Sequence, residues 1–132
     1  MIKVAKITGD DCLLFADCDG KQMDKVIEEV QNLYSNISVN DIYCVCHEIE
    51  SWYYAGVSLN NKKILKIKQR EETTDRLTKE KFYEYLGIND PENQLETRLY
   101  IMLRMTELFE IKLACTYNNS FNSFFQKRQS LF

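Results

Sequence analysis

The sequence has little of several features that mark particular classes of protein. It contains one proline and four glycines among 132 residues, which excludes a collagen-like or linker-dominated chain. No stretch approaches the roughly 18 apolar residues that a membrane-spanning helix needs. The first residues, MIKVAKITGDDC, also lack the basic region and apolar run of a secretory signal. We therefore expect a soluble, cytoplasmic protein with no membrane partner.

Charge of one sign is not in large excess either. The chain has 17 basic and 20 acidic side chains, and its net charge of −3 argues against a generally cationic coat protein for nucleic acids. Hydrophobic residues make up 45% and charged residues 28%, as in globular proteins. Because one domain usually has about 100–200 residues, residues 1–132 are predicted to form a single domain.

Histidine is scarce, and the number of cysteines is odd. The five cysteines and one histidine fit a reducing compartment, in which thiols act mostly as small core residues. Zinc binding by Cys44, Cys46 and His47, together with Cys12 and Cys18, is an alternative. Only one residue separates the two cysteines, which is shorter than the usual spacing of a zinc knuckle, so buried thiols are the favoured interpretation.

Apolar runs and their periodicity predict an α/β fold. Residues 12–16 and 42–46 are short apolar runs typical of buried strands, and the apolar stripe between them predicts a helix over 21–35. Strand, helix and strand in this order make a βαβ unit with parallel strands. A further short strand is indicated by three apolar residues, Ile2, Val4 and Ile7. The expected sheet is small and mostly parallel, with flanking helices.

The second half of the sequence is predicted to be helical. The expected boundaries are an N-cap at Thr78 with an end near Gly87, a start at Asp90 and Pro91 with a break before Ile111, and an N-cap at Ser120. Residues 48–55 fit a helical turn ended by Gly56 but stay ambiguous, and residues 62–70 are left unassigned.

Paired acidic residues follow each of the two predicted strands. Asp17 and Asp19 come directly after the first strand, and Glu48 and Glu50 come directly after the second. Ligands of parallel α/β sheets bind at the carboxyl ends of strands, where a βαβ unit brings such groups together. Carboxylate oxygens suit Mg²⁺. The alternative is that these residues only begin the helices that follow.

A basic strip follows in residues 62–70. It carries five cations within nine residues, among which Lys66, Lys68 and Arg70 are candidates for contacts with nucleic-acid phosphates. A solvated surface balanced by the acidic residues after it explains the pattern equally well.

Three short motifs occur in order along the sequence: FADCDG, CHEIESWYYAG and NNSFNSFF. Together they resemble the Toprim-like proteins of an uncharacterised-domain family related to the RloB and OLD-type nucleases. Its members carry an Asp-x-Asp strand end, a His-Glu-x-Glu-x-Trp-type segment and a Ser-Phe-x-x-Phe helix. The matching residues here are Asp17, Asp19, His47, Glu48, Glu50, Trp52, Ser120, Phe121 and Phe124. The resemblance spans residues 12–125.

The resemblance implies a Toprim-like (Rossmann-like) fold that holds Mg²⁺ or Mn²⁺ for phosphodiester chemistry. Its catalytic and metal-binding residues would be Asp17, Asp19, Glu48 and Glu50, with the aspartates as main ligands and the glutamates as a further ligand and general base. The sequence departs from the family in one respect. Toprim domains begin with a strand that ends in a glutamate, whereas residues 1–11 contain none. Asp10, Asp11, Glu48 and Glu50 are the candidates to replace it.

The sequence thus leads to a nuclease-like, divalent-metal-dependent enzyme that acts on nucleic acid as the first hypothesis. The alternative is a catalytically silent module that binds metal or a protein partner. That partner could also be a second copy of the chain, which would make a homo-oligomer. A nucleotide-phosphate hydrolase is the third option.

Overall fold

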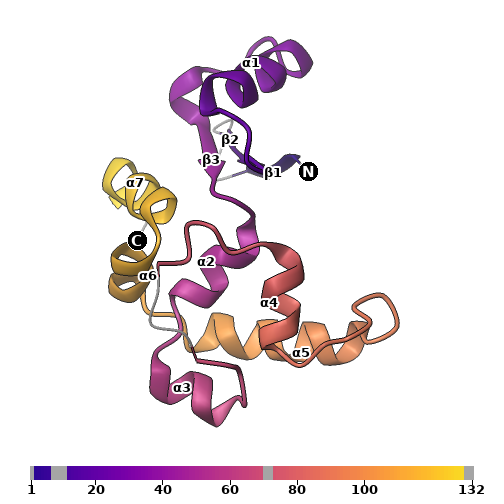
Figure 1. The fold of residues 1–132 in the computed structure, drawn as a ribbon. Helices are drawn as coiled ribbons and strands as arrows, with labels where there is room; N and C mark the ends of the chain where they lie inside the picture. Colours follow the sequence, from indigo (N-terminus) through magenta and orange to yellow (C-terminus); the bar gives the residue numbers. More distant parts are fainter. Residues whose placement is uncertain (1, 7–11, 70–72, 130–132) are drawn as a thin grey trace.

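The computed structural model describes residues 2–6, 12–69 and 73–129. Its described strands form one sheet in the order β1 (Ile2–Lys6), β2 (Cys12–Asp17) and β3 (Ile42–Val45) (Figure 1). The protein is therefore α/β, as predicted. β2 and β3 are parallel and are connected through α1 (Met23–Leu33), the helix expected over 21–35.

The expectation of a mostly parallel sheet is wrong, because the sheet is mixed. β1 pairs with β2 in the antiparallel direction, from Ile2 opposite Ala16 to Lys6 opposite Cys12. A parallel return needs a crossover of a dozen or more residues. Only residues 7–11 separate β1 from β2, so the sequence between them is too short for such a connection.

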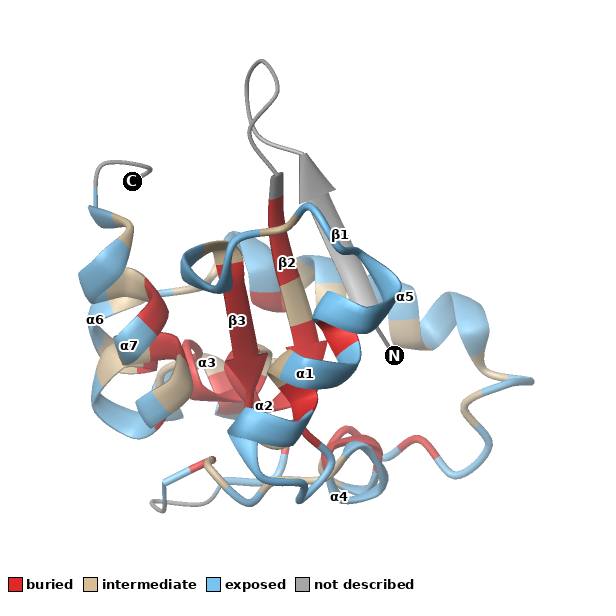
Figure 2. Ribbon diagram, turned by 90° about the horizontal axis from the view of Figure 1, so that it is seen from above, coloured by how far each residue is buried: buried red, intermediate tan, exposed pale blue. Residues whose placement is uncertain are grey.

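Both faces of the sheet are covered, which explains the continuous apolar runs of its strands. Successive side chains of a strand point to opposite faces. Leu14 and Ile42 therefore pack against α1, whereas Leu13 and Tyr43 face the helices of the second half. Figure 2 shows β2 and β3 as mostly buried strands and α1 as a helix with a mostly exposed outer surface.

The rest of the chain is helical, as predicted. The helices are α2 (Ile49–Ala55), α3 (Leu59–Ile64), α4 (Lys79–Tyr85), α5 (Leu95–Glu107), α6 (Ile111–Tyr117) and α7 (Asn119–Lys127). α2, α6 and α7 pack against the sheet, and α3, α4 and α5 surround the opposite end of α2 (Figure 1). No helix in the described part of the chain is both long and apolar enough to cross a membrane.

Two of the predicted helix starts are wrong and one is confirmed. The Thr78 hydroxyl accepts a hydrogen bond from the Lys81 amide, as an N-cap should. At α7 the capping side chain is Asn118 and not Ser120, which lies within the helix. α5 begins at Leu95 rather than at Asp90, because the Gln94 side-chain carbonyl accepts the amide hydrogens of Asn89 and Asp90 and holds a turn there.

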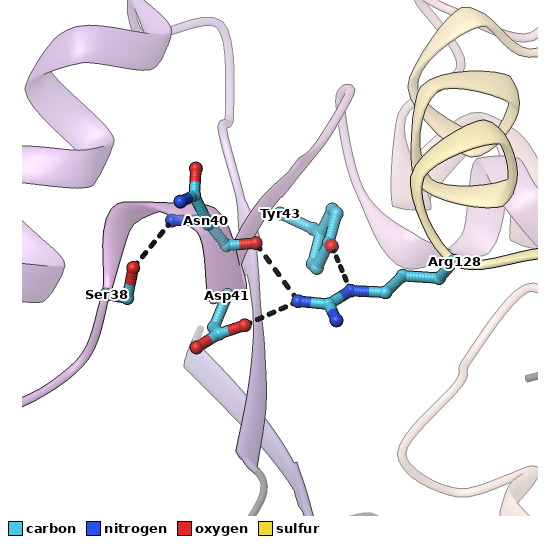
Figure 3. A network of polar contacts seen from close by, with 5 residues as sticks. All are labelled: Ser38, Asn40, Asp41, Tyr43 and Arg128. Carbon is cyan, nitrogen blue, oxygen red and sulfur yellow. Dashed lines mark hydrogen bonds and ion pairs between the residues drawn. The ribbon is translucent and has the colours of Figure 1, made fainter. Parts of the chain in front are cut away.

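The end of α7 is tied to the beginning of β3 by Arg128 (Figure 3). Its Nε donates to the Tyr43 hydroxyl at 2.6 Å, and its Nη2 donates to the Asn40 carbonyl at 3.3 Å and to the Asp41 carboxylate. Charge-assisted bonds of this kind are stronger than neutral ones. They hold the C-terminal helix against the strand that leads to Glu48 and Glu50.

Candidate functional site

The four acidic residues singled out in the sequence line one cleft. Asp17 ends β2, Asp19 follows it in a turn, and Glu48 and Glu50 lie at the start of α2. The backbone brings the two segments together, because the Asp19 amide donates to the His47 carbonyl at 3.3 Å. The cleft has a volume of about 770 Å³, and α4, α5 and the connection between them form its other side.

Two of these carboxylates are held by backbone amides at helix N-termini. The Asp17 Oδ1 atom accepts a hydrogen bond from the Ile49 amide at 3.0 Å, at the first residue of α2. The Glu48 Oε2 atom accepts one from the Lys79 amide, at the first residue of α4. Helix N-termini carry partial positive charge and favour such carboxylates. The bonds also fix the position of both helices relative to the end of β2.

The Glu50 carboxylate is different, because its oxygens are accessible from the cleft although the residue as a whole is nearly buried. Glu50 is 9% exposed and lines the cleft, yet among the described residues no hydrogen bond or ion pair reaches its carboxylate. Its charge lies close to that of Glu48, and the two carboxylates repel each other. A cation in the cleft would provide the missing interaction.

Negative charge is concentrated around Glu48. Burial raises the pKa of its carboxyl group, the Lys79 amide opposes this, and the carboxylates of Asp19 and Glu50 raise it further. Asp19 lies within hydrogen-bonding reach of Glu48. Two carboxylates at such a distance repel each other unless a proton or a cation lies between them.

These residues fit a magnesium ion as a carboxylate pair and not as a closed cage. Mg²⁺ is usually bound through one or two carboxylates and keeps several of its waters. Asp19 and Glu48 supply such a pair, with Glu50 and Asp17 beside it. Among the described residues there is no group of three or more His, Cys, Asp or Glu side chains placed to hold a metal ion.

The opposite wall of the cleft contains residues that sequence reasoning missed. Lys79 and Arg98 are its cations, and Tyr83, Leu99 and Met102 give it an apolar surface. The Arg98 guanidinium carbon lies 5.7 Å from the centroid of the Tyr83 ring, within range of a cation–π interaction. No local motif marks these residues, because tertiary packing alone brings α4 and α5 to the cleft.

The cleft as a whole is acidic. Its lining contains seven carboxylates, since Glu80, Asp90 and Glu92 add to the four discussed above, against two cations. A phosphate group entering it would therefore meet net repulsion unless cations were bound there too.

The predicted basic strip does not line this cleft. Lys66 and Lys68 are exposed and lie beyond α3, and the Lys68 amide donates to the Tyr85 carbonyl at 2.9 Å. Arg70 lies outside the described residues. The role of the strip in binding nucleic acid stays a prediction.

A buried polar network holds the segment that carries Glu48 and Glu50. The Asn118 amide nitrogen donates to the hydroxyls of Thr74 and Ser51, at 2.9 and 3.2 Å. Ser120 accepts hydrogen bonds from the Trp52 ring nitrogen at 2.8 Å and from the Cys46 amide at 3.1 Å. The side chains of Asn118, which caps α7, and of Ser120 within α7 therefore hold α2 in position.

Comparisons with known proteins add nothing to this geometry. No protein-family model, curated protein or solved structure matches the chain. The resemblance to Toprim-like proteins accordingly depends on the three sequence motifs.

Proposed function

We propose that the cleft binds Mg²⁺ or Mn²⁺ and performs nuclease-like phosphodiester chemistry on nucleic acid. The observation that carries the proposal is the gathering of the Asp19, Glu48 and Glu50 carboxylates in one cleft, where Asp19 lies within hydrogen-bonding reach of Glu48 and no hydrogen bond or ion pair from a described residue reaches Glu50. Carboxylates gathered in one place repel each other, and a bound cation removes this repulsion. The arrangement therefore favours a cation site.

Each group has a role in this proposal. The carboxylates of Asp19 and Glu48 hold the ion, and Asp17 orients the start of α2 through the Ile49 amide. The bound ion supplies Lewis-acid polarisation of a phosphoryl oxygen. Glu50, which lines the cleft beside Glu48, accepts the proton of the attacking water at its carboxylate oxygen.

The cations across the cleft complete the proposed site. Lys79 and Arg98 contact phosphate oxygens of the substrate, and the apolar wall around Tyr83 faces a base. In this proposal Lys79 and Arg98, and not Lys66, Lys68 and Arg70, contact the reacting phosphate. The basic strip would contact phosphates farther along the nucleic acid.

The missing first-strand glutamate is consistent with a changed arrangement of the site. β1 is antiparallel to β2, and its last residue, Lys6, pairs with Cys12, at the end of β2 opposite to Asp17. A glutamate at the end of this strand would therefore lie far from the cleft. We assign its role to Glu50, whereas Asp10 and Asp11 lie outside the described residues.

The test combines cation binding with cleavage. Mg²⁺ or Mn²⁺ at about 100 times its dissociation constant should stabilise the protein by about 2.7 kcal/mol, measured as a rise in Tm. Glu50→Gln should raise the Tm of the cation-free protein and remove much of the cation effect. Asp19→Asn should remove the effect and abolish cleavage of single- or double-stranded DNA or RNA. Asp24→Asn, an exposed change in α1 outside the cleft, is the matched control. Equal cation effects in all these proteins would refute the site.

A second candidate function is a catalytically silent module that binds a protein partner. The excess of carboxylates over cations in the cleft favours it, since such a surface suits a basic peptide better than a polyanion. α5 also exposes four large apolar side chains, Leu95, Leu99, Tyr100 and Leu103. Absence of cleavage with both metals, together with a stable partner or a homo-oligomer in solution, would favour this function.

A further inference from the structure

Two cysteines lie opposite each other just beyond the ends of β2 and β3, close in sequence to the carboxylates of the cleft. The parallel register of β2 and β3 ends with Asp17 opposite Val45, so that the next residues across the sheet are Cys18 and Cys46. The Cys18 amide donates to the Val45 carbonyl at 3.0 Å, which continues the pairing beyond the last pair of the ladder.

The sulfur atoms of this pair are already in contact. Cys18 Sγ and Cys46 Sγ are 3.1 Å apart, and both belong to or pack against the cluster between the sheet and α1. A disulfide joins cysteines whose Cα atoms are usually 4.4–6.8 Å apart, and neighbouring strands lie about 4.8 Å apart. The backbone therefore requires no large movement for a bond between these sulfurs.

We propose that Cys18 and Cys46 form a reversible disulfide by exchange with a low-molecular-weight disulfide such as oxidised glutathione. Cys46 is half-buried whereas Cys18 is 2% exposed, so Cys46 is the sulfur that a small disulfide reaches first, although burial and the contact with Cys18 raise the pKa of its thiol and slow the exchange. Its thiolate attacks one sulfur of the small disulfide, breaks that bond and releases one thiol. The Cys18 thiolate then attacks the Cys46 sulfur of the mixed disulfide and releases the second thiol. The two cysteines are oxidised by two electrons, and their two protons leave on the two small thiols.

The bond would join the two segments that position the cleft carboxylates. Cys18 directly precedes Asp19, and Cys46 lies two residues before Glu48. Oxidation would therefore fix the distance between the turn after β2 and the start of α2, whatever ligand the cleft takes. Cys44 could compete with Cys46 for the bond to Cys18, but it lies two residues before Cys46 and pairs with Ala16 in the sheet.

The experiment counts free thiols before and after oxidation of the full chain. The protein is incubated with oxidised glutathione at about pH 8.5, near the ordinary pKa of a thiol, and is then alkylated under denaturing conditions. Intact mass should show the loss of two of the five thiols, and fragmentation should link Cys18 to Cys46. A reductant should restore all thiols. The non-reduced oxidised protein should melt higher by on the order of 5 °C.

Cysteine-to-serine variants identify the pair. Cys46→Ser should keep its four thiols or stop at a mixed disulfide, whereas Cys44→Ser and Cys115→Ser, the matched controls, should still lose two. Loss of two thiols in Cys46→Ser would overturn the assignment. So would a wild-type protein that keeps all five thiols, or one that accumulates only glutathione adducts.

Discussion

Replacement of Asn118 by alanine should strongly destabilise the protein, because this side chain connects three separate parts of the chain. Asn118 is 1% exposed. Its Oδ1 atom accepts hydrogen bonds from the Phe121 amide at 2.9 Å and from the Ser120 hydroxyl at 2.7 Å. Its Nδ2 atom donates to Thr74 and Ser51.

The magnitude follows from the groups that would lose a partner. Removal of an N-cap costs about 0.5–2 kcal/mol. The Ser120 hydroxyl would lose its acceptor, Asn118 Oδ1, and a polar group left without its hydrogen bond in the interior costs a further 1–3 kcal/mol or so. The free energy of unfolding should therefore fall by about 2–4 kcal/mol, a large part of the roughly 5–15 kcal/mol that stabilises a typical domain.

Urea unfolding followed by the fluorescence of Trp52, the only tryptophan, measures this loss. The slope of the free energy against urea should be unchanged if the denatured state keeps its compactness. The matched control is Asn119→Ala, one residue later, where the amide side chain is exposed and contacts Asp75. A similar loss of stability in Asn118→Ala and Asn119→Ala would refute the reasoning.

Two further predictions concern Gly56 and Lys62. In Gly56→Ala the new Cβ would overlap the Phe109 ring, so overpacking should cost about 1–3 kcal/mol. An unchanged Tm in thermal unfolding would contradict this. Burial lowers the pKa of Lys62 to about 8, although its Nζ lies 3.6 Å from the centroid of the Tyr54 ring, so the folded state disfavours the charged form. Lys62→Met should therefore stabilise the protein by about 1–3 kcal/mol at neutral pH, and this gain in stability should shrink as the pH rises from about 8 towards 10.5. Urea unfolding at several pH values measures the gain. A gain that does not depend on pH would exclude the explanation.

The elements that local periodicity governs were predictable from the sequence. The stripe of α1 and the apolar runs of β2 and β3 repeat over a few residues, so each needs only its own segment to be recognised. α3 was missed because LNNKKI has no apolar stripe. It depends instead on the Ser58 cap, which accepts the Asn61 amide, and on burial of Lys62.

Only one side of the candidate cleft was predictable. Asp17 and Glu48 follow strands, and the end of a strand can be read from the residues next to it. Lys79 and Arg98 reach the cleft through the packing of α4 and α5, which no short segment encodes. The direction of β1 was likewise not predicted, although the short stretch before β2 favours an antiparallel return.

The aromatic layer of the sheet has a consequence for how the chain acquires its structure. Phe15 and Tyr43 pack against Phe124, and Arg128 bonds to the Tyr43 hydroxyl across 85 residues of sequence. Contacts between such distant residues form slowly, because a long loop must close before they stabilise anything. During synthesis on the ribosome, the parallel strands β2 and β3 therefore keep one apolar face exposed until α7 has emerged. We expect the protein to depend most on chaperones at this nascent stage.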